Sequence, residues 1–337
     1  MNVPIPTAKS IAIFRPLNTY IGQYRQSIKS WEAEEKLDLF FYRPLGFLCA
    51  KTAKFIGISP TEVTVLGIFS GLAAAFCFWQ YVNLPILSGR PGFADLLSFY
   101  AGVFFFLLSG ILDSADGQLA RLTGKSSRVG LVLDGVADNI VFTSVYIAAI
   151  SALIRADAYG PYFFFFALLA GFAHSNQSAM LDFMHREYLY FGCGKNHNDD
   201  YWNPTLEEAR NFREKGNVRE IIVPLLRYSW IWQQQKFSVR SSQQRMRMKA
   251  KLQELSDNGG DTDHFSAAYR SYNRYIISFW RLLGSNFHTF AIIFFIFIRH
   301  FEWYLLWVDL LGLNLVMVVA NYWQKKQDEK FFKLFAI

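Results

Sequence analysis

The chain has 337 residues, of which 52% are hydrophobic and 18% aromatic, and Phe alone occurs 34 times. Its net charge is +7, but the basic residues flank long apolar stretches, which indicates contact with anionic lipid headgroups and argues against nucleic-acid binding. The three cysteines are widely spaced and odd in number, so they predict neither a disulfide framework nor a zinc site.

The N-terminal segment, residues 1–58, has a mixed composition. Residues 20–42 alternate charged and aromatic side chains, which is typical of an amphipathic helix lying at a membrane interface. A plain solvated helix is the alternative interpretation of the same pattern.

Six apolar stretches are long enough to cross about 30 Å of hydrocarbon. The first begins with a capping box, in which Ser59 is the N-cap, Pro60 follows and Glu62 closes the box. The second is expected to continue as a helix to Arg121 and to break at Gly124. The predicted spans are residues 62–81, 96–112, 129–154, 162–181, 287–301 with further residues taken from 276 onward, and 303–323.

The distribution of Lys and Arg sets the predicted topology. The loops after the first, third and fifth spans carry few charges, whereas both termini and residues 182–275 carry many basic residues. We therefore expect an integral membrane protein with both termini and the active site on the cytoplasmic side. The predicted fold is an all-α, six-transmembrane-helix bundle with an N-terminal interfacial helix and a helical cytoplasmic insert. The predicted segments are 1–58 (interfacial), 59–185 (spans one to four), 186–275 (insert) and 276–337 (spans five and six with a basic tail).

Within the insert, Thr205 and Glu208 predict the start of a short helix that Gly216 ends. Residues 221–232 are apolar but too short to cross a membrane, and residues 236–255 are predicted to form one basic helix, followed by a turn at 258–261. The insert's role stays open between a structural elaboration, a cap over the cytoplasmic mouth, a dimer contact and an acceptor site.

Four aspartates lie in or beside the second and third spans, at positions 113, 116, 134 and 138. An ionised carboxylate at membrane depth is costly unless it is paired or bound to a cation, so each is a candidate for function. Asp113 and Asp116 share one helix face, and Asp134 and Asp138 share another. The two pairs lie at similar distances from the turn at Gly124, so we expect all four at similar depth on two antiparallel helices. An all-carboxylate set without Cys or His favours Mg²⁺ or Mn²⁺ over zinc.

Small and basic residues accompany these acids. Gly117 and Ala120 predict a groove where a bulky ligand approaches the helix, and Gly130 predicts matching clearance on the next helix. Arg121 lies two turns from Asp113 on the same face, where a guanidinium can hold a phosphate through two hydrogen bonds. The cation-binding aspartates, the arginine and the space left by the small residues together predict a pyrophosphate site rather than a proton path.

This pattern resembles the signature of the CDP-alcohol phosphatidyltransferase family at every fixed position. The matching residues are Asp113, Asp116, Gly117, Ala120, Arg121, Gly130, Asp134 and Asp138. The lead-in from Arg43-Pro44-Leu45 through Ile58-Ser59-Pro60 to Thr64 also resembles the family, and the likeness covers residues 40–185 well and the last two spans only in outline. The 182–275 insert departs from the family pattern.

The resemblance implies a reaction and residue roles. The four aspartates would bind two metal ions, Mg²⁺ or Mn²⁺, and Gly117, Ala120, Arg121 and Gly130 would hold the cytidine diphosphate part of the donor. Asp138 would also be the catalytic base for the hydroxyl of an alcohol or lipid acceptor, with release of CMP. The reaction would serve the synthesis of phospholipids or of sphingolipid head groups. Membrane lipids would surround the enzyme, and the family resemblance also fits a homodimer.

Outside the motif, one face of the fourth span carries His174, Ser178 and Asp182, with Arg186 one turn beyond. These residues predict either an acceptor pocket or interhelical hydrogen bonding with an Asp182–Arg186 pair. For Asp309 in the sixth span we expect a nearby hydrogen-bond partner and no catalytic part.

Different classes of function remain as alternatives to the transferase. A divalent-cation or proton transporter would use the aspartates as an ion path, but it would not need the spacing of Gly, Ala and Arg. A metal-dependent membrane phosphatase has only the acids in its favour. Within the transferase class, either a CDP-linked lipid meets a soluble alcohol or a CDP-linked head group meets a lipid hydroxyl.

Overall fold

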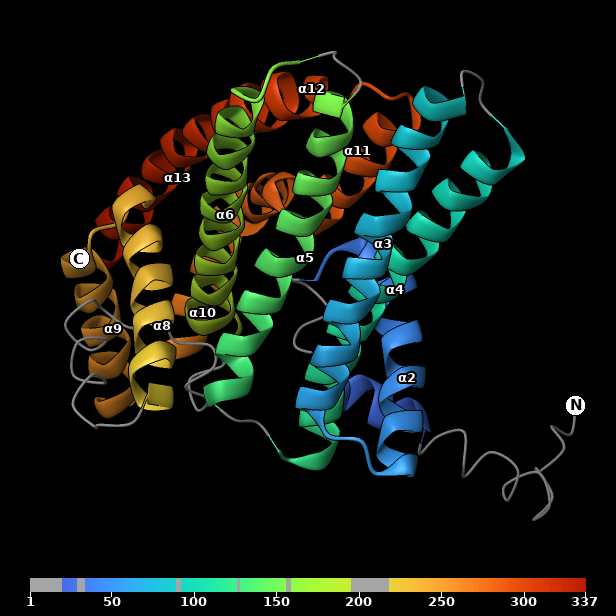
Figure 1. Ribbon diagram of the computed structural model, residues 1–337. Helices are drawn as coiled ribbons and strands as arrows, with labels where there is room; N and C mark the ends of the chain where they lie inside the picture. The colour runs from blue at the N-terminus through green and yellow to red at the C-terminus, as the bar shows by residue number, and fades with distance from the viewer. Residues whose placement is uncertain (1–19, 29–33, 89–91, 126–127, 156–158, 195–217) are drawn as a thin grey trace, which may run out of the picture. The chain divides into compact units, whose positions relative to one another are not determined.

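The computed structural model of the chain describes residues 20–28, 34–88, 92–125, 128–155, 159–194 and 218–337 (Figure 1). Within these ranges all regular structure is helical, which confirms the predicted all-α class. By packing, the chain divides into two compact units. Unit 1 takes residues 1–71 and 107–138, and unit 2 takes residues 72–106 and 139–337.

The N-terminal part of unit 1 is not the single helix that the sequence predicted over residues 20–42. Residues 20–27 are helical, residues 28, 34 and 35 are not, and a π-helical turn, η1 (Asp38–Tyr42), leads into α2 (Arg43–Ile56). α2 ends at Gly57, whose φ of 82° is the left-handed conformation that favours glycine. The alternation of charged and aromatic residues continues through the break, which is why the pattern alone did not reveal it.

Of the next two helices, the first begins and the second ends where the sequence predicted, but the first continues past residue 81 to Ser88. α3 (Pro60–Ser88) starts with the expected capping box, because the Ser59 amide donates to Glu62 Oε2 (2.7 Å) and the Glu62 amide donates to Ser59 Oγ (3.3 Å). α4 (Phe93–Thr123) continues past the apolar stretch through the motif. Gly124, at φ 65°, ends it, and the Lys125 amide donates to the Ala120 carbonyl (3.1 Å).

Small side chains let the helices of unit 1 approach each other closely. The core joins α2, α3 and α4 through Ala50, Ala53, Val63, Ala115 and Leu119. At one crossing the Ser109 hydroxyl donates to the carbonyl of Gly67 (2.9 Å). Close backbones joined by side-chain hydrogen bonds are how membrane helices pack without a hydrophobic driving force.

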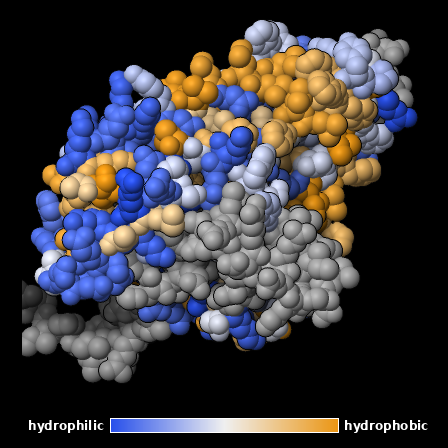
Figure 2. Space-filling model, turned by 90° about the vertical axis from the view of Figure 1, so that its left-hand side faces the viewer, coloured by the Kyte–Doolittle hydropathy of each residue, from blue (hydrophilic) through white to orange (hydrophobic). Residues whose placement is uncertain are grey.

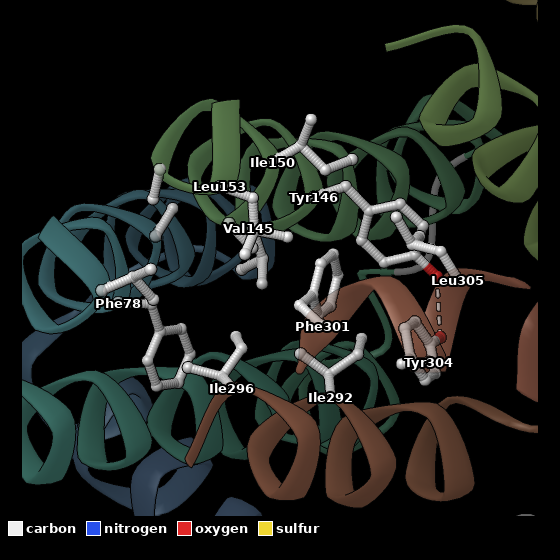
Figure 3. Packing of buried hydrophobic residues seen from close by; sticks show 14 of the residues in the cluster. Phe78, Val145, Tyr146, Ile150, Leu153, Ile292, Ile296, Phe301, Tyr304 and Leu305 are labelled. Carbon is white, nitrogen blue, oxygen red and sulfur yellow. Dashed lines mark hydrogen bonds between the residues drawn. The ribbon is translucent and has the colours of Figure 1, made fainter. Parts of the chain in front are cut away.

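Unit 2 has a larger core rich in aromatic residues (Figure 3). Its helices beyond the shared α3 and α4 are α5 (Arg128–Arg155), α6 (Phe163–Glu187), η2 (Tyr188–Gly192), α8 (Val218–Phe237), α9 (Ser242–Asp257), α10 (Thr262–Trp280), η5 (Arg281–Leu283), α11 (Ser285–Phe297), α12 (Phe301–Trp303), η6 (Tyr304–Leu313) and α13 (Asn314–Phe335). The first residues of α5, 128–138, belong to unit 1. In this core Phe78 of α3, Val145 of α5, Ile292 of α11 and Phe301 of α12 point toward one another (Figure 3).

Five helical stretches of the described chain are long and apolar enough to cross a membrane, where the sequence predicted six spans. They are Pro60–Asn83, Phe93–Thr123, Val136–Arg155, Thr262–Phe297 and Phe301–Phe335. α6 is helical where the fourth span was predicted, but the polar run from His174 to Ser178 lowers the hydropathy of its second half. The six-span count is therefore not confirmed, and α6 is the helix on which it depends.

The two C-terminal spans are longer than predicted, and their helices change type along the way. α10 runs through the 3-10 turn η5 into α11, which starts at Ser285 after the extended residue Gly284. The turn predicted between the spans is present, with Arg299 at φ 60°. The last span continues from α12 through the π-helix η6 into α13.

The break between the two predicted segments of the insert lies a few residues later than predicted. Instead of one basic helix over 236–255, α8 ends at Phe237 and α9 starts at Ser242. Ser241 is the N-cap, and its hydroxyl accepts from the Gln244 amide (3.1 Å). The continuous polar composition hid this capping box. The predicted turn at 258–261 is present, whereas the helix predicted between Thr205 and Gly216 lies outside the described residues.

A buried arginine joins the insert to the C-terminal helices. Arg240 lies between α8 and α9 and donates to Asp328 (2.5 and 2.7 Å), Glu187 (3.1 Å) and the Tyr269 hydroxyl (2.7 Å). Burial opposes its charge, but the two carboxylates prevail and hold the pKa of Arg240 well above its usual value.

On the face seen in Figure 2, hydrophobic side chains gather in one broad area and hydrophilic ones in another, as partial embedding in lipid requires.

Candidate functional site

The acids of α4 lie in unit 1 beside the first membrane helix. Asp116 is buried, with 6% of its surface exposed, and its Oδ2 accepts a hydrogen bond from the Thr64 hydroxyl of α3 (2.5 Å). Asp113, one turn earlier, is half-buried. The Thr64 hydroxyl therefore holds Oδ2 of Asp116 at a fixed position.

An arginine from the start of α2 stands next to these acids. Arg43 donates through Nε and one terminal NH₂ to Oε2 of Glu34 (3.1 and 2.9 Å) and through its other NH₂ to Ser114 Oγ (3.4 Å). Burial opposes the charge of Arg43, but Glu34, Asp38 and Asp113 outweigh it and raise the pKa of the guanidinium. Arg43 therefore supplies permanent positive charge close to Asp113.

The guanidinium of Arg121 lies over Gly117. Its Nε donates to the carbonyl of Ser27 (2.6 Å), which fixes the plane of the group. Its two terminal nitrogens lie 3.5 and 3.6 Å from where a Cβ on Gly117 would stand. The missing side chain at Gly117 thus lets the guanidinium lie close to the helix backbone.

Gln118 joins the motif helix to the N-terminal segment. Its side chain is fully buried and donates to the Ser27 hydroxyl (3.2 Å) and to the backbone carbonyl of Arg43 (3.1 Å). Gly46 of α2 makes room for it, because a Cβ there would stand 2.8 Å from Gln118 Oε1 and 2.9 Å from Ser114 Oγ. The position of Arg43 and the plane of Arg121 therefore both depend on this close packing.

The second pair of acids is only partly covered by the structure. Asp138 lies on α5 and is exposed. Gly130 and Asp134 are on the same helix but outside the residues whose surroundings are described. The structure brings Asp113, Asp116, Gly117, Ala120 and Arg121 together on α4, and the meeting of the two acid pairs stays a prediction.

The residues of the predicted acceptor pocket have different neighbours. Asp182 accepts from Arg186 (3.0 Å), the pair foreseen as the alternative, and also from Trp230 and Gln234 of α8 (both 3.2 Å). His174 instead lies within hydrogen-bond distance of a buried tyrosine in the core of unit 2. Ser178 is half-buried between them on α6. Whether these four residues bind an acceptor stays a prediction.

The donor set of α4 suits a hard divalent cation. Two carboxylates one helical turn apart offer oxygen ligands, Thr64 orients one of them, and Arg43 balances part of their charge. Oxygen ligands with such supporting hydrogen bonds are what Mg²⁺ and Mn²⁺ prefer in proteins. The residues present therefore fit the cations that the motif implies.

Several residues that surround the acids of α4 had no role predicted from the sequence. Thr64 and Arg43 were noted only as part of the lead-in, and Ser27, Glu34 and Gln118 were not noted. The position of Thr64 near the start of the first predicted span could have indicated a polar partner for its hydroxyl. The contacts of Gln118 had no signal in the sequence, because they join residues 75 and 91 positions apart.

Comparisons with known proteins agree with this geometry. Residues 58–189 match the sequence model of the CDP-alcohol phosphatidyltransferase family. The chain is 32% identical over 108 residues to the archaetidylinositol phosphate synthase of Pyrococcus horikoshii, which covers 32% of this chain and 49% of that protein. It is 28% identical over 114 residues to the uncharacterized CDP-alcohol phosphatidyltransferase class-I family protein 2 of Dictyostelium discoideum, which covers 34% of this chain and 26% of that protein.

These matches cover only part of each relative. The chain spans about half the length of the first of these curated relatives and about a quarter of the second. No solved structure matches the chain significantly. The matched segment nevertheless contains Thr64, the whole eight-residue pattern and the helices that carry it. Residues 58–189 of this integral membrane protein are therefore similar in sequence to the CDP-alcohol phosphatidyltransferase family.

Proposed function

We propose that the chain is a phosphotransferase that moves a substituted phosphate from a CDP-linked donor to an alcohol and releases CMP. The observation that carries this proposal is the guanidinium of Arg121 lying against Gly117, on the same helix as the Asp116 carboxylate that Thr64 holds in place. A diphosphate needs both an arginine and cation-binding carboxylates within reach of one surface, and a simple ion path needs neither the glycine nor the arginine.

In the proposed reaction the acceptor hydroxyl attacks the donor phosphorus that bears the transferred group. A new P–O bond forms as the bond to the oxygen of CMP breaks, and the hydroxyl proton passes to the Asp138 carboxylate. Bound Mg²⁺ or Mn²⁺ at the aspartates would neutralise the charge that develops on the phosphate oxygens. In this proposal Arg121, whose Nε donates to the Ser27 carbonyl, orients the diphosphate, and the Thr64 hydroxyl holds Oδ2 of Asp116 in position.

The relatives suggest the first acceptor to test. The Pyrococcus protein is named for archaetidylinositol phosphate, so inositol phosphate joins glycerol phosphate and serine as candidate soluble alcohols for a CDP-linked lipid. The reverse arrangement uses a CDP-linked head group with diacylglycerol or ceramide. For either donor we propose a cytoplasmic active site, because the basic residues lie on the side of both termini.

The test is CMP release by the purified chain in lipid, offered labelled CDP-donors with each acceptor and Mg²⁺ or Mn²⁺. We expect metal-dependent release that falls about 10²–10⁴-fold in Asp138→Asn, the range for loss of a general base. Asp263→Asn, at an exposed acid outside the motif, is the matched control. Metal flux across vesicles without any CMP release from the full donor panel would instead support transport and overturn the proposal.

A further inference from the structure

A polar cluster lies inside the apolar core of unit 2. It consists of Tyr146 from α5, His174 from α6, His288 from α11, and Tyr304 and Asp309 from η6. All five side chains are buried, with exposures between 0% and 6%. Figure 3 shows the two tyrosines joined through their hydroxyl groups, next to Phe301 and Leu305. Titratable groups at such depth in membrane helices are costly, and they point to a function beyond packing.

The hydrogen bonds of the cluster fix the protons. The Tyr146 hydroxyl donates to Oδ2 of Asp309 (3.0 Å), so it can only accept from the Tyr304 hydroxyl (2.7 Å) and from Nδ1 of His174 (3.0 Å). Tyr304, having donated its proton to Tyr146, must accept from Nδ1 of His288 (2.6 Å). In neutral imidazoles with hydrogen on Nδ1, the Nε2 atoms of both histidines carry lone pairs.

Several of the resulting acceptors have no donor. Nε2 of His288, Oδ1 of Asp309 and Oε1 of Gln177 are buried and have no hydrogen-bond partner among the residues that the structure describes. Gln177 belongs to the same neighbourhood, because its amide donates to the backbone carbonyl of Asp309 (3.2 Å). Buried polar groups are nearly always satisfied, so unpartnered acceptors together call for a cation or another donor.

The spacing of the ligand atoms suits one metal ion. One ligand atom from each of His174, His288 and Asp309 lies within 4.8 Å of the others. Ligands that share an ion at about 2.0–2.2 Å stand roughly 3–4 Å apart, somewhat closer than the 4.8 Å within which these three atoms lie. The two imidazoles are stacked, with centroids 3.6 Å apart and planes 6° apart, and an ion must lie in the plane of each ring that binds it. Metal binding therefore requires one ring to turn out of the stack.

We propose that His174, His288 and Asp309 form a second metal site, for a first-row transition metal such as Zn²⁺ or Fe²⁺. Two histidines and one carboxylate are a donor set that these metals favour, unlike the all-oxygen set of the motif. Tyr146 and Tyr304 hold the Nδ1 edges of the rings, as second partners of metal-binding histidines usually do. Asp309 lies within the π-helix η6, a rare conformation that is frequent at functional sites. The ion would join α6, α11 and η6 directly, and α5 through Tyr146.

The test is a titration of the metal-stripped full chain in lipid nanodiscs with Co²⁺ alone, after purification without a histidine tag. We expect visible absorption bands of nitrogen-ligated Co²⁺, saturating at about one ion and displaced by Zn²⁺. In His174→Gln, His288→Gln and Asp309→Asn the apparent Co²⁺ affinity is expected to fall at least about 10-fold. His264→Gln is the matched control, because His264 is on α10 of the same unit and is exposed.

A further variant separates this site from the motif. In Asp113→Asn the Co²⁺ bands are expected to persist, because Asp113 belongs to unit 1 and offers only oxygen. Circular dichroism and a single elution peak identify the variants that are folded. Absence of the bands in the folded wild-type chain overturns the proposal, even if CMP release is normal. Bands that are unchanged in folded His174→Gln and His288→Gln overturn it as well.

Discussion

The hydroxyl of Thr64 donates a hydrogen bond of 2.5 Å to Oδ2 of Asp116, which joins the first membrane helix to the motif helix. Both side chains are buried, with 6% of each exposed. In the proposed enzyme this bond fixes which oxygen of Asp116 faces the cation.

Replacement of Thr64 by Val is therefore expected to raise the Mg²⁺ or Mn²⁺ concentration needed for half-maximal CMP release by about 10–100-fold, the usual cost of losing a partner of a metal ligand. The shape of the side chain is preserved, so the helix packing should not change. The measurement is CMP release against metal concentration. Thr52→Val is the control, since Thr52 is exposed and donates to the Leu48 carbonyl of its own helix. An unchanged metal dependence in Thr64→Val would show that this bond does not support the site.

A methyl group added at Gly117 is expected to weaken binding of the CDP-donor without lowering the thermal stability of the protein. In Gly117→Ala the new Cβ would stand 3.5 Å from a terminal nitrogen of Arg121, an ordinary contact, and Ala in a helix interior is favoured over Gly by about 1 kcal/mol. We therefore expect an unchanged or higher melting temperature together with a KM for the CDP-donor raised about 10-fold or more, because the methyl group occupies the approach of the diphosphate.

The control for Gly117 is Gly67→Ala on α3. Its Cβ would also make only ordinary contacts, at 3.6 Å from Leu112 Cβ and 3.7 Å from the Ser109 carbonyl. Donor KM should be unchanged there. If both variants raise KM equally, the effect comes from helix packing and not from the surface beside Arg121.

Arg43 is expected to matter for catalysis through the charge that it places near Asp113. Arg43→Gln keeps a hydrogen-bonding side chain but removes the positive charge, which leaves Glu34 buried without its ion-pair partner. We expect kcat/KM for CMP release to fall about 10-fold or more, and the double variant Arg43→Gln with Glu34→Gln to regain thermal stability but not activity. Arg25→Gln, at an exposed position of the same unit, is the control. Full activity of the double variant would limit Arg43 to a structural role.

The buried ion cluster at Arg240 should dominate the stability of unit 2. Arg240→Met leaves Glu187 and Asp328 buried without their cation, and removal of one partner of a buried pair typically costs about 3–5 kcal/mol. Lys251→Met removes one partner of the exposed pair with Glu254, which is worth about 0–1 kcal/mol. Thermal unfolding followed by circular dichroism should therefore show a much larger loss for Arg240→Met. Equal losses would mean that the insert is held by its apolar contacts alone.

The local features of this chain could be predicted from its sequence. The capping box at Ser59, the end of α4 at Gly124 and the placement of the motif on α4 depend on residues within one or two turns of each other, so short-range chemistry determines them. The same holds for Gly117 and Arg121, which share a helix face through their spacing of four residues. The break before α9 was also local, but its capping box lay hidden in a continuous polar run.

Only the tertiary structure decided which distant residues meet. Thr64 and Asp116 are 52 positions apart, Arg43 and Ser114 are 71 apart, and Tyr146 and Asp309 are 163 apart. No periodicity specifies such pairs, because they result from how whole helices pack. Asp309 was expected to have a partner, and burial in an apolar core made that expectation correct, but the identity of the partner came from the packing of four helices. The sequence determined which chemistry α4 carries, and helix packing decided which groups hold it in place.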